Sequence, residues 1–269
     1  MNENRFFWLR GICVFAAAMA LMLTAGAFLQ RQFGMYGVLY TQFILLAVSI
    51  IGVIVLKLDF KEVFPFKIPR VRQVIGVFIM VPAGMLVSAI TVYPALMLFP
   101  ESIELVESIG RLFQTVPGLT GWMIVAISPA ICEEALHRGL IQHTFERSGF
   151  KSKWIIILCM GFIFGIFHVD PVRFLPTTII GMIITYISLE SKNILLPVLY
   201  HFANNSLSFF AGSLTPPNGA ELAEAMELMG EMMLPLLVMG FMLSVFGLLI
   251  LRLGAKLVRA PSAPSACPA

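Results

Sequence analysis

The chain has 269 residues, of which 59% are hydrophobic and only 12% are charged, and its mean hydropathy is +0.92. Soluble domains are about 25% charged, so this composition excludes a soluble globule, a disordered chain and a collagen-like repeat. The net charge of +3 is small and scattered, and predicts no nucleic-acid partner. The sequence therefore predicts an all-α fold, a polytopic transmembrane helix bundle in a lipid bilayer.

Eight apolar windows have the length, or nearly the length, of a membrane-spanning helix, which needs about 20 mostly apolar residues. In chain order, they cover residues 11–29, 39–56, 74–98, 121–145, 154–168, 177–189, 194–214 and 232–251. The fifth and sixth are short, so seven or nine spans are alternatives to about eight. The first window also fits a signal peptide, but its apolar run continues past the small residues at 25–27. We expect a single membrane-embedded domain over residues 1–259.

Lys and Arg residues gather in alternate connections between these windows, and only Arg31, Arg111 and Arg173 fall in the others. Short cytoplasmic loops collect Lys and Arg, so we expect both termini to be cytoplasmic. The acidic segments 101–107 and 221–231 carry apolar residues at helical spacing and predict amphipathic surface helices. The Pro/Ser/Ala-rich tail, 260–269, predicts disorder. Short loops and the lack of targeting signals favour an integral protein of a prokaryotic cell membrane.

Ionisable side chains occur inside three of the eight windows. The fourth holds a dense polar cluster, the fifth ends on a histidine, and the seventh carries a histidine and an amide. Because such groups are costly in a membrane, each is a candidate functional residue. The candidates are the ionisable residues Glu133, Glu134, His137, Arg138, His168 and His201, together with the amide Asn205.

The two adjacent glutamates are expected to have different roles. On an α-helix, Glu134 and Arg138 lie about 40° apart and can form an ion pair, whereas Glu133 and Arg138 lie about 140° apart. We therefore interpret Glu134 and Arg138 as a structural, supporting pair. Glu133 has no obvious countercharge except His137, one turn on, and is the candidate general base.

The candidate residues also share a depth. Glu133, His168 and Asn205 each lie 13 or 14 residues from the cytoplasmic end of their helix, which is roughly 20 Å at 1.5 Å per residue. His201 lies one turn shallower, on the same helix face as Asn205. Three helices are thus expected to bring a carboxylate, two imidazoles and an amide together.

Three motifs in this region resemble those of the CAAX prenyl endopeptidase and bacteriocin-processing (CPBP, or Abi) intramembrane protease family. They are Glu133-Glu134-Ala-Leu-His-Arg138, Phe164-Gly-Ile-Phe-His168 and His201-Phe-Ala-Asn-Asn205, within a catalytic core of about 121–210. His137 departs from the pattern, since the family often has Phe at that position.

The resemblance implies an intramembrane glutamate-dependent endopeptidase. Glu133 and His168 would activate a water, and His201 and Asn205 would stabilise the oxyanion. No metal cofactor is needed in this scheme. The resemblance fits a peptide, a lipoprotein, another membrane protein or a prenylated CAAX tail as the substrate.

Two alternatives remain open at this point. One is a metalloprotease with zinc on Glu133, His168 and His201 and with Glu134 as the base, although the sequence has no His-Glu-x-x-His helix. The other is a non-enzymatic membrane scaffold, immunity protein or ion path with the same fold.

Overall fold

The computed structural model describes residues 3–99, 102, 115–214 and 233–259, and every regular element in them is helical. The short helices are η1 (Glu3–Phe6), α4 (Phe60–Val63), and the π-helical turns η2 (Met22–Gly26), η3 (Met123–Ile127) and η4 (Ala135–Ile141). The α-helices are α1 (Trp8–Leu21), α2 (Ala27–Phe33), α3 (Met35–Val55), α5 (Val71–Leu98), α7 (Gly118–Trp122), α8 (Ser128–Glu134), α9 (Gln142–Arg147), α10 (Lys153–Phe167), α11 (Pro171–Ser191), α12 (Leu195–Leu214) and α14 (Met233–Val258). The prediction of an all-α, polytopic helical bundle is confirmed.

Each of the eight apolar windows overlaps one helix or one continuous run of helices, and most of these helices extend beyond the window. Six of these runs are long and apolar enough to cross a membrane, namely 8–33, 35–55, 71–98, 118–147, 171–191 and 234–258. Helix α10 is apolar but shorter, and α12 carries the polar residues His201, Asn204 and Asn205. The count of eight spans therefore stays a prediction. The predicted amphipathic helices and the tail lie outside the described residues.

The sixth window was expected to begin at residue 177, but α11 begins six residues earlier, at Pro171. Its first turn is stabilised by Asp170, whose Oδ1 accepts a hydrogen bond from the backbone N–H of Val172. A proline at the first helical position and an aspartate cap are favourable even where the turn is polar. Arg173 is therefore part of a helix and not of a connecting loop.

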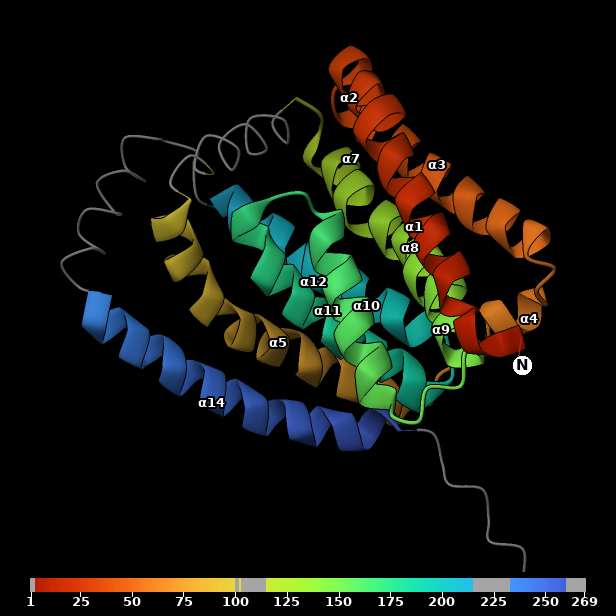
Figure 1. The fold of residues 1–269 in the computed structure, drawn as a ribbon. Helices are drawn as coiled ribbons and strands as arrows, with labels where there is room; N and C mark the ends of the chain where they lie inside the picture. Colours follow the sequence, from red (N-terminus) through yellow and green to blue (C-terminus); the bar gives the residue numbers. More distant parts are fainter. Residues whose placement is uncertain (1–2, 100–101, 103–114, 215–232, 260–269) are drawn as a thin grey trace, which may run out of the picture.

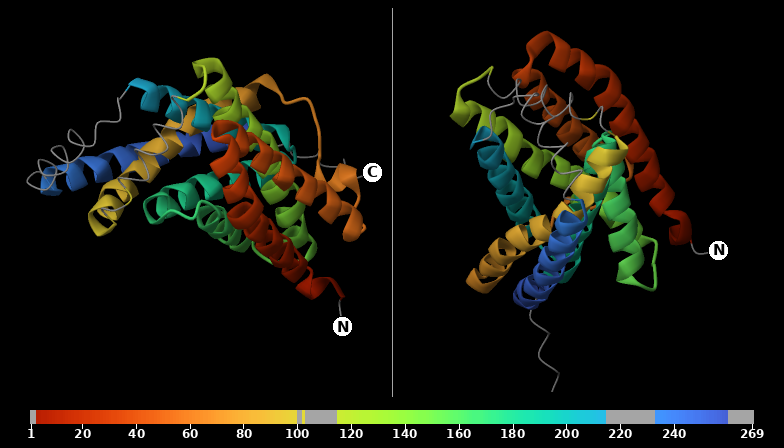
Figure 2. Two further views of the ribbon diagram at one scale, coloured as in Figure 1. Left: turned by 90° about the horizontal axis from the view of Figure 1, so that it is seen from above. Right: turned by 90° about the vertical axis from the view of Figure 1, so that its left-hand side faces the viewer.

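The helices are arranged around the continuous run 118–147. On one side lie α1, α2 and α3, and on the other α10, α11 and α12, while α5 and then α14 form the far edge of the bundle (Figures 1 and 2). One apolar cluster joins the central run to α1, α3 and α10 around Leu136 and Phe145. A second joins α5, α11 and α12 around Ile184 and Tyr200. Helix α12 also packs against α8 and η3 of the central run, so the run has neighbours on both sides.

The basic segments that the charge pattern assigns to one side of the membrane all meet at one end of the bundle. The contacts connect the chain start, the 57–72 segment, the 146–153 loop, the α11–α12 turn and the end of α14. They join Trp8 to Ser148, Lys192 to Glu146, Asn193 to Lys67, and Gln73 to Val258. The alternation of segments between two ends therefore agrees with the charge pattern.

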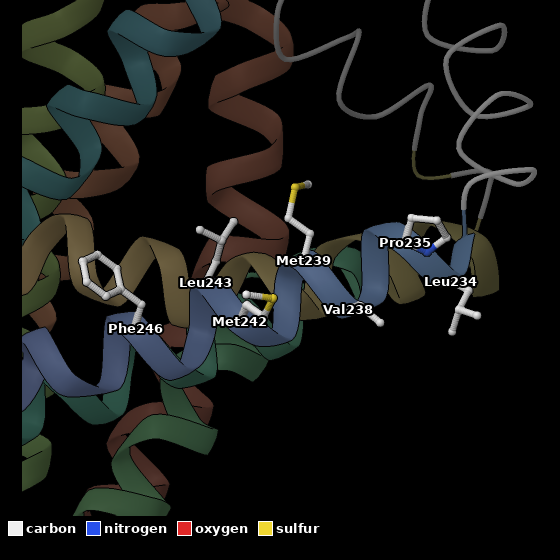
Figure 3. Close-up of a pocket in the computed structure, with 7 residues that line it drawn as sticks. All are labelled: Leu234, Pro235, Val238, Met239, Met242, Leu243 and Phe246. Carbon is white, nitrogen blue, oxygen red and sulfur yellow. The ribbon is translucent and has the colours of Figure 1, made fainter.

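The outer face of α14 carries an apolar hollow (Figure 3). Its lining is Leu234, Pro235, Val238, Met239, Met242, Leu243 and Phe246. None of these side chains is polar, and none belongs to the helices that carry the candidate residues. This surface suits contact with lipid chains.

Candidate active site

The polar cluster of the central run lies where α8 passes into the π-helical turn η4. Glu133, Glu134, His137 and Arg138 are all buried. A π-helical turn is wider than an α-helical one and is frequent at functional sites. Here two carbonyl oxygens at the junction accept side-chain hydrogen bonds: that of Ala135 from Ser49 Oγ at 2.8 Å, and that of Glu133 from His137 Nδ1 at 2.9 Å.

Glu134 is the centre of a buried charge network. Its Oε1 accepts a hydrogen bond from Arg138 Nη1 at 3.1 Å and another from His201 Nδ1 at 2.7 Å. The Glu134 and Arg138 side chains are both fully buried. Arg138 Nη2 also donates to the carbonyl of Gly181 in α11, at 3.0 Å. The expected ion pair between Glu134 and Arg138 is therefore present, and it links the central run to α11 and α12.

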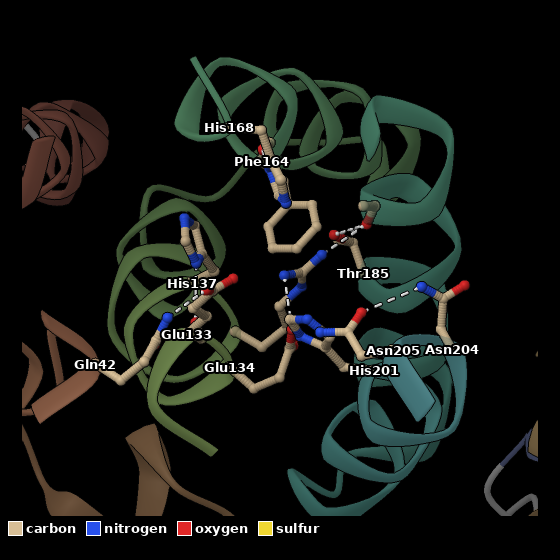
Figure 4. Close-up of polar contacts among 12 residues, drawn as sticks. Gln42, Glu133, Glu134, His137, Phe164, His168, Thr185, His201, Asn204 and Asn205 are labelled. Atoms are coloured by element: carbon tan, nitrogen blue, oxygen red, sulfur yellow. Dashed lines mark hydrogen bonds and ion pairs between the residues drawn. The ribbon is translucent and has the colours of Figure 1, made fainter. Parts of the chain in front are cut away.

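Glu133 has a different set of neighbours. Its Oε1 accepts a hydrogen bond from Gln42 Nε2 of α3 at 2.9 Å (Figure 4). His137 was considered as a countercharge for the Glu133 carboxylate, but its Nδ1 donates to the backbone carbonyl of Glu133. The charged groups that act on Glu133 over a longer range are His201, Glu134 and, most weakly, Arg173 in the first turn of α11. The carboxylate next to the ion pair is thus hydrogen-bonded by a neutral amide.

The ring of Phe164 lies at the centre of the site (Figure 4). Its centroid is 4.9 Å from that of His168, 5.2 Å from His137 and 5.7 Å from His201. The guanidinium carbon of Arg138 lies 4.4 Å from the same centroid, a cation–π distance. One aromatic side chain of α10 therefore packs against polar groups from the central run and α12, and the structure brings the three motifs together.

His168 follows the last residue of α10, and its Nδ1 lies 2.8 Å from the carbonyl oxygen of Phe164. A carbonyl only accepts, so Nδ1 carries the proton and Nε2 of the neutral ring is an acceptor. The next residue, Val169, has a φ of 53°, a value that β-branched residues rarely adopt. The turn after His168 is therefore strained, as turns at functional sites often are.

Gly165 fixes the approach of α10 to α11 just before this turn. A Cβ at this position would lie 2.0 Å from Thr178 Oγ1 and 2.8 Å from the carbonyl oxygen of Phe174. Only glycine allows the two helices to lie this close, three residues before His168.

His201 and Asn205 lie one turn apart on α12. Asn205 Nδ2 donates to the carbonyl of Val125 at 3.1 Å, and its Oδ1 accepts from Asn204 Nδ2 at 3.3 Å. The second N–H of the Asn205 amide is left for another acceptor. His201 uses Nδ1 toward Glu134, which leaves its Nε2 for a further contact.

Several buried polar atoms in and beside the site have no hydrogen-bond partner within the described part of the chain. They are Gln42 Oε1, Glu134 Oε2, His137 Nε2, Arg138 Nε and Asp170 Oδ2. Buried polar atoms are normally paired with protein or ordered water. Their concentration here makes the site a favourable place for bound water.

A metal site has little support in this geometry. Within residues 3–99, 102, 115–214 and 233–259, no three or more His, Cys, Asp or Glu side chains are arranged to hold a metal ion. The zinc alternative needs Glu133, His168 and His201 around one ion, and each histidine would have to bind through Nε2, because His168 Nδ1 faces the Phe164 carbonyl and His201 Nδ1 faces Glu134. Chelation of the purified protein separates this alternative from a metal-free reaction.

Sequence reasoning missed the hydrogen-bond partner of Glu133, Gln42, and a charged residue that acts on Glu133 over a longer range, Arg173. Gln42 is an amide inside an otherwise apolar window. This was a usable signal, because polar side chains inside membrane-spanning helices are costly and usually have a functional role. Arg173 was assigned to an outer connection, because the polar first turn of α11 has no apolar periodicity.

Comparison with known proteins gives one match. Residues 115–207 match the family model described as type II CAAX prenyl endopeptidase Rce1-like. No curated protein and no solved structure matches the chain. The matched segment contains all three motifs, and it confirms the family predicted from them.

Proposed function

We propose that the protein is an intramembrane endopeptidase that hydrolyses a peptide bond with a water activated by Glu133. The observation that carries this proposal is the difference between the two adjacent glutamates. Glu134 is bonded to Arg138 and His201, whereas the Glu133 carboxylate is hydrogen-bonded by the neutral amide of Gln42. A carboxylate that is not committed to an ion pair is free to take a proton. The substrate class is a peptide or a membrane protein within the bilayer.

In the proposed reaction, Glu133 takes a proton from a water while the water oxygen attacks the peptide carbonyl carbon. His168 Nε2 accepts a hydrogen bond from the other O–H of the water and so orients the oxygen. When the tetrahedral intermediate collapses, the C–N bond breaks and the nitrogen receives the proton held by Glu133. The products are a new carboxyl terminus and a new amino terminus, and the reaction consumes one water.

The oxyanion requires hydrogen-bond donors in a site of low polarity. The second N–H of Asn205 is one such donor. His201 is the other, since its Nδ1 is used by Glu134 and its Nε2 donates in the imidazolium form. In this scheme Glu134 and Arg138 are positioning residues, because they hold His201 and connect it to α11.

The proposal is tested by incubating the purified protein with a peptide library and reading the products by mass spectrometry. Wild type should cleave, and cleavage should persist after thorough chelation, with no stoichiometric zinc by elemental analysis. Loss of cleavage on chelation and recovery with zinc would favour the metalloprotease. If wild type cleaves nothing, the scaffold alternative is favoured and the proposal fails.

We also propose that both termini are cytoplasmic and that the protein lies in a prokaryotic cell membrane. The orientation rests on the basic segments that meet at one end of the bundle, and the assignment to a prokaryotic membrane rests on the short loops between the apolar windows. In a variant without native cysteines, a cysteine at exposed Lys151 should react with an impermeant thiol reagent only after the cells are opened. A cysteine at exposed Gln32, near the C-terminal end of α2 and at the other end of the bundle from Lys151, should react in intact cells. The reverse pattern would overturn the orientation.

A further inference from the structure

Gln42 is a polar contact of Glu133 that comes from outside the matched segment. It lies in the first half of α3, is 6% exposed, and donates from Nε2 to Glu133 Oε1 at 2.9 Å. Its side chain points from α3 toward the central run (Figure 4). None of the three motifs includes this residue.

The orientation of the amide follows from its partner. An ionised carboxylate accepts hydrogen bonds and cannot donate, so the nitrogen of Gln42 must face Glu133. The Gln42 oxygen is buried and has no partner among the described residues. The hydrogen bond to Glu133 is thus the one side-chain contact of this kind that the described structure gives Gln42. A leucine would be cheaper at this depth if Gln42 had no role beyond packing.

Helix α3 is attached to the same junction at a second point. Ser49 lies two turns after Gln42, on the same helix face, and its hydroxyl donates to the carbonyl of Ala135 in η4 at 2.8 Å. The two contacts fix α3 relative to the backbone that carries Glu133. Gln42 is therefore presented to the carboxylate by a braced helix.

We infer that Gln42 is a positioning residue that assigns different tasks to the two oxygens of Glu133. This inference rests on the proposed peptidase function. The amide holds Oε1 and so restricts rotation of the carboxylate, which leaves Oε2 to take the proton from the water. Positioning contacts of this kind typically change activity by about 10- to 100-fold.

The variants that test this are Gln42→Leu, which removes the amide, and Gln42→Asn, which keeps it but is shorter by one methylene and does not reach Glu133. The matched control is Thr41→Val. Thr41 is also buried, but its hydroxyl donates to the carbonyl of Gly37 in its own helix. Each variant is assayed with the peptide that wild type cleaves best. The binding of this peptide to each variant is measured in a separate titration.

Both Gln42 variants should lower kcat by about 10- to 100-fold with KM and bound peptide within about twofold of wild type. Thr41→Val should match wild type. A loss of folding would reduce bound peptide in proportion to activity, and that result for both Gln42 variants would overturn the inference. If Gln42→Leu alone unfolds, Gln42→Asn decides.

The failure of this inference differs from that of the proposed function. If wild type and both Gln42 variants cleave equally while Glu133→Gln does not, only the role of Gln42 is wrong. If wild type does not cleave at all, the proposed function fails and the role of Gln42 fails with it.

Discussion

The central run 118–147 and helix α14 are both long enough to cross a membrane, but they are stabilised in different ways. In its most apolar window, 56% of the central run is buried, against 11% of α14. The central run holds buried carboxylates, a guanidinium and an imidazole, each with at least one hydrogen-bonded partner. Most of the α14 surface is apolar and exposed. Since lipid solvates apolar side chains, α14 does not have to be buried among other helices. The central run, in contrast, must pair its polar groups with partners inside the protein.

Helix α14 is held by close packing on α5. A Cβ at Gly247 would lie 2.9 Å from the carbonyl oxygen of Ala83, and one at Gly254 would lie 2.9 Å from that of Gly76. Small residues that let backbones approach are the usual means of helix association in membranes. The comparison implies that substitutions in the central run alter activity or leave buried polar groups unpaired, while those at the glycines of α14 act through steric fit.

The largest expected effect is on activity at Glu133. Glu133→Gln keeps the shape and can still accept the hydrogen bond of Gln42, but the amide cannot take a proton from water. We expect kcat to fall by about 10³-fold with thermal stability within about 1 kcal/mol of wild type. Cleavage kinetics and melting curves in detergent measure both quantities. Full activity in this variant would exclude Glu133 as the base.

The next effect is on stability, one residue further along the helix. Glu134→Gln leaves the buried guanidinium of Arg138 without its carboxylate, and breaking such a pair costs about 3–5 kcal/mol. Adding Arg138→Gln should recover part of this loss, because no unpaired charge remains. The control is Glu133→Gln combined with Arg138→Gln, which should show no recovery. Equal recovery in both double variants would contradict the assignment of the ion pair to Glu134.

A smaller effect is expected in α14. Gly247→Ala forces a Cβ against the backbone of α5 and should lower stability by about 1–3 kcal/mol, with kcat unchanged. Gly240→Ala is the matched control, because its nearest neighbour, Ile90 Cγ1, would lie 3.6 Å from the new Cβ. That variant should melt at or slightly above the wild-type temperature. If both variants melt alike, close packing does not hold α14.

The helices and the motif residues of the site were predictable because they depend on local signals. Apolar length located one helix or helical run in each window, and the i,i+4 spacing of Glu134 and Arg138 was enough to predict their pair. Helical rise also predicted that Glu133, His168 and Asn205 would share a depth.

The remaining contacts depend on tertiary structure or on departures from a regular α-helix. The π-helical turn η4 breaks the 100° periodicity, and His137 donates to the backbone of Glu133 and not to its carboxylate. The partner of Glu133 lies 91 residues away, in α3. No local pattern connects Gln42 to the helix that carries the first motif, so only the packing of α3 against the central run reveals the contact.

The central claim is that Glu133 activates a water that attacks the peptide carbonyl, and digestion in H₂¹⁸O tests it most directly. Wild-type protein should cleave the peptide and place one ¹⁸O in each new carboxyl terminus, as read by mass spectrometry. Glu133→Gln should give neither cleavage nor label under the same conditions, whereas labelled products from Glu133→Gln at the wild-type rate would contradict the account.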